Sequence, residues 1–408
     1  MPSSPTSPNG PGRVEFVILI SAIMMIVAFA IDSMLPALPA ISHALGIVDV
    51  SQRPLVISSF LLGFAVGQLF VGTLSDRYGR RGLMLWSLFG FAVASLAAAL
   101  APTFDHLLAA RGVQGIFAAG ARVIVTSTVR DRFEGRDMAQ VMSLSSMIFM
   151  AAPILAPAMG QAILLVGPWR WIFGALAAIG LAIWAWVLWR LPETLAAQNR
   201  IPIERDTVIA SAKLVLTDRM SVGYSVAMAM LSCALFGFLM SVQQIFETTF
   251  QRADLLPTGF AIMASGMAIA SLMNAAFVQR FGMRLIGHGA LFFFTIIAAI
   301  HAALSLNGYE SLPVFIGLQM LMMMGFSFVA GNFGAMAMEN MGGAAGMASS
   351  LQGSLANLLG TVFGTIIGQS FDGTTGPLYI GFTVSGVVAL AAVYVTEGGR
   401  FFVARHNH

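Results

Sequence analysis

Long apolar runs and short polar segments alternate along the whole chain. Each run is close to the roughly 20 residues that an α-helix needs to cross the hydrocarbon core of a bilayer. The pattern therefore predicts an all-α integral membrane protein with about twelve transmembrane helices. The predicted spans are residues 15–36, 53–74, 83–102, 106–128, 138–165, 169–190, 220–246, 257–279, 286–305, 311–333, 345–369 and 377–397.

The longest polar stretch lies between the sixth and the seventh run, which divides the chain into two halves. A weak repeat agrees with this division: segments 74–81 and 277–284 share two arginines and a glycine at one constant offset. Two pseudo-symmetric six-helix bundles are a transporter architecture, with the substrate site between them near the bilayer midplane. The predicted parts are a disordered cytoplasmic tail 1–14, a bundle 15–190, a cytoplasmic linker 191–218, a bundle 219–397 and a cytoplasmic tail 398–408.

Basic residues are concentrated in alternate loops. With the N-terminus inside, sixteen arginines and lysines fall on cytoplasmic segments and only three, Arg53, Arg170 and Arg252, on outer loops. Positive residues favour the cytoplasmic side of membrane helices. The pattern predicts a multi-pass protein of a bacterial inner membrane with both termini cytoplasmic. It also explains the pI near 9.4 without a nucleic-acid partner.

Composition argues against several other classes of protein. Hydrophobic residues make up 58% of the chain and charged residues only 10%, whereas soluble proteins carry roughly 25% charged residues. The single cysteine, Cys233, excludes an intrachain disulfide, and the six histidines have no metal-ligand spacing. The chain has no Gly-x-x-x-x-Gly-Lys phosphate loop. We therefore expect neither an enzyme nor a bound cofactor or metal, and a proton gradient as the energy source.

The most specific segment follows the second run: Gly72-Thr73-Leu74-Ser75-Asp76-Arg77-Tyr78-Gly79-Arg80-Arg81. Glycine permits a tight turn, and an aspartate accepts charge-assisted hydrogen bonds. A plain positive loop would need arginines, but not glycine and aspartate at these spacings. The segment resembles motif A, the loop 2–3 signature of the major facilitator superfamily. With the inner end of the fourth run, the resemblance implies a conformational latch of Gly72, Asp76, Arg77, Gly79, Arg80, Arg81, Arg130 and Asp131.

Three more segments resemble motifs of the same superfamily. Residues 111–115 (RGVQG) are similar to motif B. Residues 32–41, an aspartate followed by LPALP after two residues, most resemble the bicyclomycin- and chloramphenicol-resistance branch of the twelve-span drug/proton antiporters. Residues 152–161 resemble motif C, the antiporter motif.

Motif C is matched at Pro153, Pro157 and Gly160, whereas Ala156 and Gln161 replace its usual glycines. The two prolines lie four residues apart on one helix face. Because proline removes a backbone donor and clashes with the preceding turn, we expect them to bend the predicted fifth span.

Asp32 is the only acid well inside an apolar run of the first half. Burial in lipid penalises a charged carboxylate, which makes protonation possible near neutral pH. From a rise of about 1.5 Å per residue, Asp32 and Arg111 lie level in the outer half of the membrane. We expect these two residues to carry proton coupling. Arg111 could pair with Asp32, backbone carbonyls or substrate, and Asp32 could instead cap the outer end of its helix.

The predicted substrate-binding residues are less specific. Met25 and Phe29 share a helix face with Asp32, and Arg122 shares one with Arg111. Arg122 could attract an anionic cargo or extend to the cytoplasmic interface, and polar residues in the second half could form interhelical hydrogen bonds instead of lining a cavity. The predicted set is Met25, Phe29, Asp32, Gln114, Arg122, Gln243, Gln244 and Asn274.

Together these features favour a monomeric exporter of small amphiphilic compounds that works by alternating access in exchange for protons. Two alternatives on the same fold stay open: a metabolite exporter for a sugar, amino acid or similar compound, and a proton-independent uniporter. An integral-membrane enzyme would need clustered reactive residues, and a sensor would usually append a soluble domain. The sequence displays neither feature.

Overall fold

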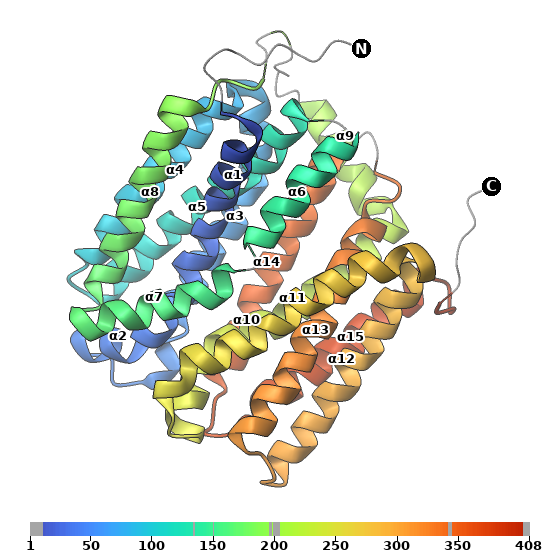
Figure 1. Ribbon diagram of the computed structural model, residues 1–408. Helices are drawn as coiled ribbons and strands as arrows, with labels where there is room; N and C mark the ends of the chain where they lie inside the picture. The colour runs from blue at the N-terminus through green and yellow to red at the C-terminus, as the bar shows by residue number, and fades with distance from the viewer. Residues whose placement is uncertain are drawn as a thin grey trace. The chain divides into compact units, whose positions relative to one another are not determined.

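The computed structural model describes residues 11–133, 135–149, 151–195, 198, 205–341 and 345–402. All regular elements in this part of the chain are helical (Figure 1), and eleven stretches are long and apolar enough to span a membrane. The predicted all-α membrane fold is confirmed. The long helices are α1 (Arg13–Asp32), α3 (Leu55–Tyr78), α4 (Arg80–Ala99), α5 (Phe104–Arg132), α8 (Arg170–Arg190), α10 (Arg219–Gln244), α11 (Leu256–Phe281), α12 (Met283–Leu306), α13 (Leu312–Ala337), α14 (Ala345–Gln369) and α15 (Gly376–Thr396).

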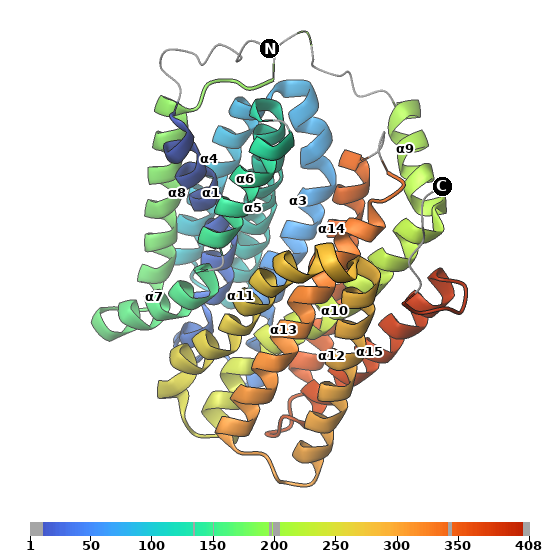
Figure 2. The ribbon, with the colours of Figure 1, turned by 45° about the vertical axis from the view of Figure 1, so that its right-hand side comes forward.

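The predicted single span 138–165 is wrong, because two helices of 15 residues occupy this region: α6 (Gly135–Phe149) and α7 (Ala152–Val166). Pro153 stands in the first turn of α7, where its missing N–H is tolerated, but it cannot continue the preceding helix. Pro157 lies inside α7. Both ribbon views show α7 running across the direction of α8 rather than along it (Figures 1 and 2). The predicted span is therefore broken before Pro153 and not merely bent.

The chain forms two compact units, and their division differs from the predicted halves at one place. The first unit contains residues 1–34 and 62–204, and the second contains residues 35–61 and 205–408. Segment 35–61 holds η1 (Leu35–Ala37), α2 (Leu38–Ala44), η2 (Val50–Gln52) and the first residues of α3. It groups with the second unit because η1 contacts α10 and η2 contacts α14.

The polar stretch 191–218 contains a helix, α9 (Arg205–Thr217), which the sequence analysis did not identify. Val215 of α9 is buried with Met341 and Ala348. Most of the predicted N-terminal tail lies outside the described residues, and α1 already begins at Arg13. In the predicted C-terminal tail, Phe401 and Phe402 pack against Phe292 of α12. The described part of the predicted tail is therefore packed against the second unit.

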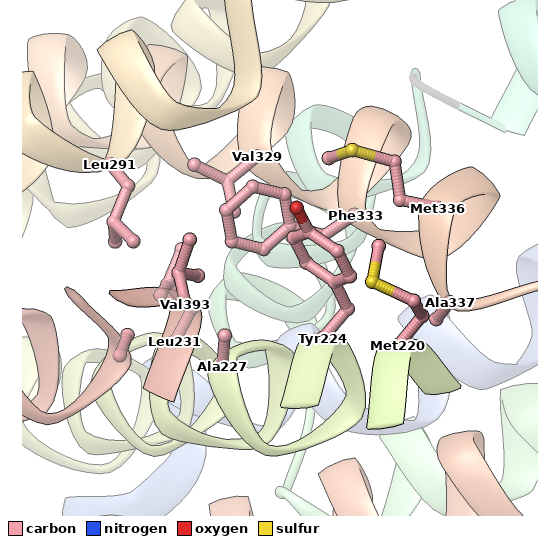
Figure 3. Close-up of a cluster of buried hydrophobic side chains, with 11 residues drawn as sticks. Met220, Tyr224, Ala227, Leu231, Leu291, Val329, Phe333, Met336, Ala337 and Val393 are labelled. Carbon is pink, nitrogen blue, oxygen red and sulfur yellow. The ribbon is translucent and has the colours of Figure 1, made fainter. Parts of the chain in front are cut away.

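The second unit has an aromatic and aliphatic core between α10, α12, α13 and α15 (Figure 3). Tyr224 and Phe333 are fully buried, and their rings meet edge to face at 4.9 Å between centroids. Leu231, Leu291 and Val393 close the cluster from three helices. This core fixes the helix ends that carry the charged residues of the second unit.

Close helix approach in the first unit depends on a Gly-x-x-x-Gly pair in α3. A Cβ added at Gly63 would lie 1.9 Å from the carbonyl oxygen of Gly112, and one at Gly67 would lie 2.6 Å from that of Ile116. Both contacts are with the backbone of α5, so neither can be relieved by turning a side chain. Small residues at such spacings let membrane helices pack backbone to backbone.

We expect Gly63→Val to separate α3 from α5 and to lower the unfolding temperature in detergent. Overpacking of this kind costs about 1–3 kcal/mol or more. The matched control is Gly174→Ala in α8, where an added Cβ meets nothing within 4 Å and helix propensity improves. Thermal unfolding of both purified variants tests the contact, and an unchanged temperature for Gly63→Val would contradict it.

Candidate functional site

The turn between α3 and α4 gathers four charged or polar side chains of the first unit. Gly79 has φ +95° as the N-cap of α4, a conformation that residues with a Cβ rarely adopt. The turn directs Arg80 back along α3, where its Nη1 donates to Asp76 Oδ1 at 2.5 Å and to Ser75 Oγ at 2.6 Å. Its Nε donates to Asp131 Oδ2 at 3.0 Å. Arg80 thus ties α3 and α4 to the end of α5.

Residues in the last turn of α8 and just after it extend this cluster, and sequence reasoning missed them. Glu193 Oε1 accepts from the backbone N–H of Arg80 at 2.9 Å, which satisfies a donor in the first turn of α4. Arg81 Nη2 donates to the carbonyl oxygen of Leu188 at 2.7 Å. Only a folded chain reveals these partners, because they lie more than a hundred residues away.

Three other predicted latch residues take less central positions. Arg77 is exposed, with its guanidinium 5.3 Å from the ring centroid of Tyr78. Arg130 is also exposed, and Gly72 is partly buried near the end of α3. The structure therefore brings together Asp76, Arg80 and Asp131 from the predicted set.

A related cluster lies in the second unit, at the position that the sequence repeat indicates. Gly282 is the N-cap of α12 with φ +77° and ψ +157°, close to the +95° and +156° of Gly79. Arg284, which the repeat aligns with Arg81, donates through Nε to Glu397 and through Nη2 to Glu339, each at 3.0 Å. The repeat is therefore structural, although the acidic partners were not predictable from it.

A buried hydrogen-bonded chain continues from Glu397. Tyr224 donates its hydroxyl to Glu397 Oε1 at 2.6 Å, and its oxygen lies 3.0 Å from His288 Nε2. The backbone N–H of Phe402 donates to His288 Nδ1 at 3.2 Å. This chain fastens the turn after α15 to α10 and α12.

Asp32 ends α1 and is 6% exposed. Among the described residues no hydrogen bond or ion pair reaches its carboxylate, although Ser33 beside it bonds the carbonyl oxygen of Phe29 at 2.5 Å. Met25 and Phe29 lie on the same side of α1 and are partly buried. Asp32 is thus a buried acid without an ionic partner among the described residues, and it ends a helix face whose other predicted residues are only partly buried.

Arg111 is fully buried on α5 and donates to Gln114 Oε1 at 2.6 Å. Gln114 is also fully buried and donates to Ser95 Oγ on α4 at 2.7 Å. The Arg111 guanidinium lies 5.8 Å from the ring centroid of Phe173 on α8. Among the described residues no ion pair joins Arg111 to Asp32, which was one of the three partners that the sequence left open for Arg111.

Arg122 and Asn274, two other predicted cavity residues, each contact a side chain of their own unit. Arg122 lies with its guanidinium 5.8 Å from the ring centroid of Phe149, at the end of α6. Asn274 accepts from Asn332 Nδ2 at 2.7 Å, which joins α11 to α13. This is the interhelical hydrogen bond that the sequence analysis left open as an alternative. Gly160 and Pro157 are buried in α7, which contacts α1.

Gln243 and Gln244 are both directed to segment 50–53. Gln244 Nε2 donates to the carbonyl oxygen of Val50 at 3.3 Å. Gln243 Nε2 donates to Glu247 Oε2 at 2.7 Å, and the same carboxylate oxygen accepts from Arg53 Nη1 at 2.6 Å. No group of three or more histidine, cysteine or acidic residues is placed to hold a metal ion in the described part of the chain.

A helical membrane protein with a repeated glycine–arginine turn and a buried acid in its first span has the features of a secondary transporter. Residues 20–365 match the family model of the Major Facilitator Superfamily. The chain belongs to this superfamily, whose members are transporters and not enzymes, and the resemblance seen in the sequence is confirmed.

Bacterial relatives agree with this assignment, and one solved structure agrees with the fold. An uncharacterized MFS-type transporter, YdgK of Bacillus subtilis, is 30% identical over 85% of this chain and 86% of its own length. The bicyclomycin resistance protein homolog of Haemophilus influenzae is 29% identical over 65% of this chain and 67% of its own. The multidrug resistance protein MdtL of a Shewanella strain is 36% identical over 40% of this chain and 41% of its own. The crystal structure of the human organic anion transporter MFSD10 (TETRAN) is similar in fold, with a TM-score of 0.69, 19% identity and coverage of 95% of this chain and 100% of that one.

Proposed function

We propose that this transporter exports small amphiphilic compounds across a bacterial inner membrane in exchange for protons. The observation that carries the proposal is Asp32, a carboxyl group 6% exposed at the end of α1 without an ionic partner among the described residues. A carboxylate in such a place is costly to keep charged. A side chain that gains a proton in one state and loses it in another is what coupling requires. The similarity to resistance proteins supports an exported, weakly polar cargo.

The proposed cycle follows from the two access states. In the outward-facing state Asp32 takes a proton from the outer side and cargo leaves. In the inward-facing state Asp32 releases the proton to the cytoplasm, and cargo binds beside Met25 and Phe29. Whether a cycle moves net charge depends on the charge of the cargo.

The orientation in this proposal places the α3–α4 turn and both termini on the cytoplasmic side. The arginines of segment 72–81 support it, because positive loops favour that side. Asp76, Arg80 and Asp131 then act as a cytoplasmic latch. The molecule works as a monomer in this proposal, since each chain carries both halves of the predicted transport path.

Reconstitution tests the proposed function. The purified protein is placed in liposomes with an internal pH dye, and candidate drugs are added on one side. We expect drug-dependent proton movement that protein-free liposomes lack. Cargo flux without proton movement would identify a uniporter instead. An absence of both with drugs, together with flux of sugars or amino acids, would favour the metabolite exporter.

A further inference from the structure

Segment 35–61 is attached to the second unit by contacts that lie at the opposite end of α3 from Arg80. Gln244 of α10 bonds the carbonyl oxygen of Val50. Pro54 lies beside Gly368 of α14, since a Cβ added at that glycine would lie 3.4 Å from the proline ring. The segment therefore rests on α10 and α14.

The strongest of these contacts is an ion pair between residues 194 positions apart in the chain. Arg53 Nη1 lies 2.6 Å from Glu247 Oε2 and 3.5 Å from Gln243 Oε1. The Arg53 side chain is 13% exposed and that of Glu247 is 36% exposed. One carboxylate oxygen of Glu247 thus accepts two hydrogen bonds, one of them from the Arg53 guanidinium, while the carboxyl group keeps access to solvent.

Glu247 is held on an unusual backbone. It lies in η4 (Ile245–Thr249), a single π-helical turn that follows α10. Such turns are rare and occur frequently at functional sites. Thr249 bonds the carbonyl oxygen of Gly373 at 2.9 Å, which fixes the far end of the turn. The turn therefore directs Glu247 toward Arg53 from a fixed base.

The other charged groups around this turn are engaged elsewhere. Asp49 accepts from the backbone N–H of Ser51 at 2.9 Å, and hydrogen bonding from the Ser51 side chain first and its backbone second holds the pKa of Asp49 below its ordinary value. Arg252 pairs with Asp254 at 3.0 Å. Asp372 accepts from Thr374. Glu247 is therefore the acid that neutralises Arg53 within the described residues.

The continuity of α3 gives the ion pair a mechanical consequence. The helix runs without a break from Leu55, in the second unit, to Tyr78, in the first. When one unit moves against the other, either α3 must bend or segment 35–61 must leave α10 and α14. If α3 stays straight, alternating access by rocking of the two halves requires the Arg53–Glu247 contact to open in each cycle.

We propose that Arg53 and Glu247 form a pH-sensitive outer latch, which opens when Glu247 takes a proton from the outer solution. This inference rests on the proposed function, which assigns the latch to the outer side of the membrane. A proton on Oε2 removes the negative charge, so the charge-assisted bond to Arg53 is lost and segment 35–61 is released. The proton leaves to the same side when the latch closes again. Glu247 therefore gates the cycle and adds nothing to the number of protons carried per cargo.

Distances between spin labels test the latch without any cargo. Labels are placed on cysteines at Val48 and Tyr309, which are 95% and 76% exposed, in a chain where the buried Cys233 is replaced by alanine. In the native chain we expect a short distance between the two labels at neutral pH. As the pH falls, a second population with a longer distance between the labels should appear and grow. Glu247→Gln and Arg53→Gln should both give the longer population at neutral pH, with the pH dependence lost.

Two further variants keep the test specific. Asp254→Asn removes a neighbouring exposed acid and should behave as the native chain. The exchange of Arg53→Glu with Glu247→Arg should restore the short distance at neutral pH. A native distribution that ignores pH, or a pH response that survives in Glu247→Gln, overturns the proposal. If drugs cause no proton movement in liposomes, the proposed antiport is wrong, but the distances between the labels are unaffected. The failure of the proposed function and the failure of the latch are therefore distinguishable.

Discussion

Replacing Asp32 by asparagine is expected to reduce drug-dependent proton movement to the level of protein-free liposomes. Asparagine has nearly the same shape but cannot exchange a proton. The site is buried and without an ionic partner among the described residues, so the neutral amide should fit there without leaving an uncompensated charge. Cargo should still equilibrate across the membrane, but it should no longer accumulate against its gradient. The internal pH dye and a cargo assay on the same vesicles measure both effects.

Two variants make this result interpretable. Asp32→Glu keeps the titratable group and should retain part of the coupling. Asp105→Asn changes an exposed acid in the first turn of α5 and should leave proton movement unchanged. Undiminished coupling in Asp32→Asn would contradict the assignment and would move the proton-carrying site to another residue.

The sequence predicted the long helices well because their signal is local. A run of apolar residues near 20 in length has few alternatives to a membrane helix, and the observed bounds differ from the predicted ones by a few residues. The break before Pro153 was expected only as a bend, because sequence alone does not say whether neighbouring helices will re-satisfy the freed backbone groups. Helix α9 was missed because the buried contact of Val215 depends on residues from another part of the chain.

For the site residues, too, contacts close in sequence were easier to predict than contacts between distant segments. Asp76 and Arg80 are four residues apart across one turn and pair with each other, and the motif had assigned both to the predicted latch. Arg111 was expected at the height of Asp32, yet it bonds Gln114, three residues further along the same helix face. A local partner needs no particular packing of other helices, whereas the distance to α1 depends on the whole bundle. Contacts such as Arg53 with Glu247 have no signal in a single sequence.

Replacing Arg80 by methionine is expected to cause the largest loss of stability among single changes in the first unit. Arg80 has a side chain 9% exposed that pairs with Asp76 and Asp131. Removing one partner of a buried ion pair costs about 3–5 kcal/mol. The loss of stability should lie toward the lower end of this range, because the Asp76 side chain is 44% exposed and water can solvate it. Thermal unfolding in detergent measures the change, and an unfolding temperature equal to that of the native protein would contradict it.

Stability and transport can be separated at this cluster, which decides whether it is a latch or a fixed joint. Arg80→Lys keeps the charge but loses the planar fork that bonds two carboxylates, so it should be intermediate in stability. Arg77→Gln alters an exposed arginine of the same turn and should leave stability unchanged.

Asp76→Asn removes one contact and leaves Asp131 to hold Arg80. If the cluster is a latch, Asp76→Asn should slow transport while cargo still binds. If cargo binding alone is lost, Asp76 does not act as a latch, and the Arg80 contacts serve only to fix the ends of α3, α4 and α5.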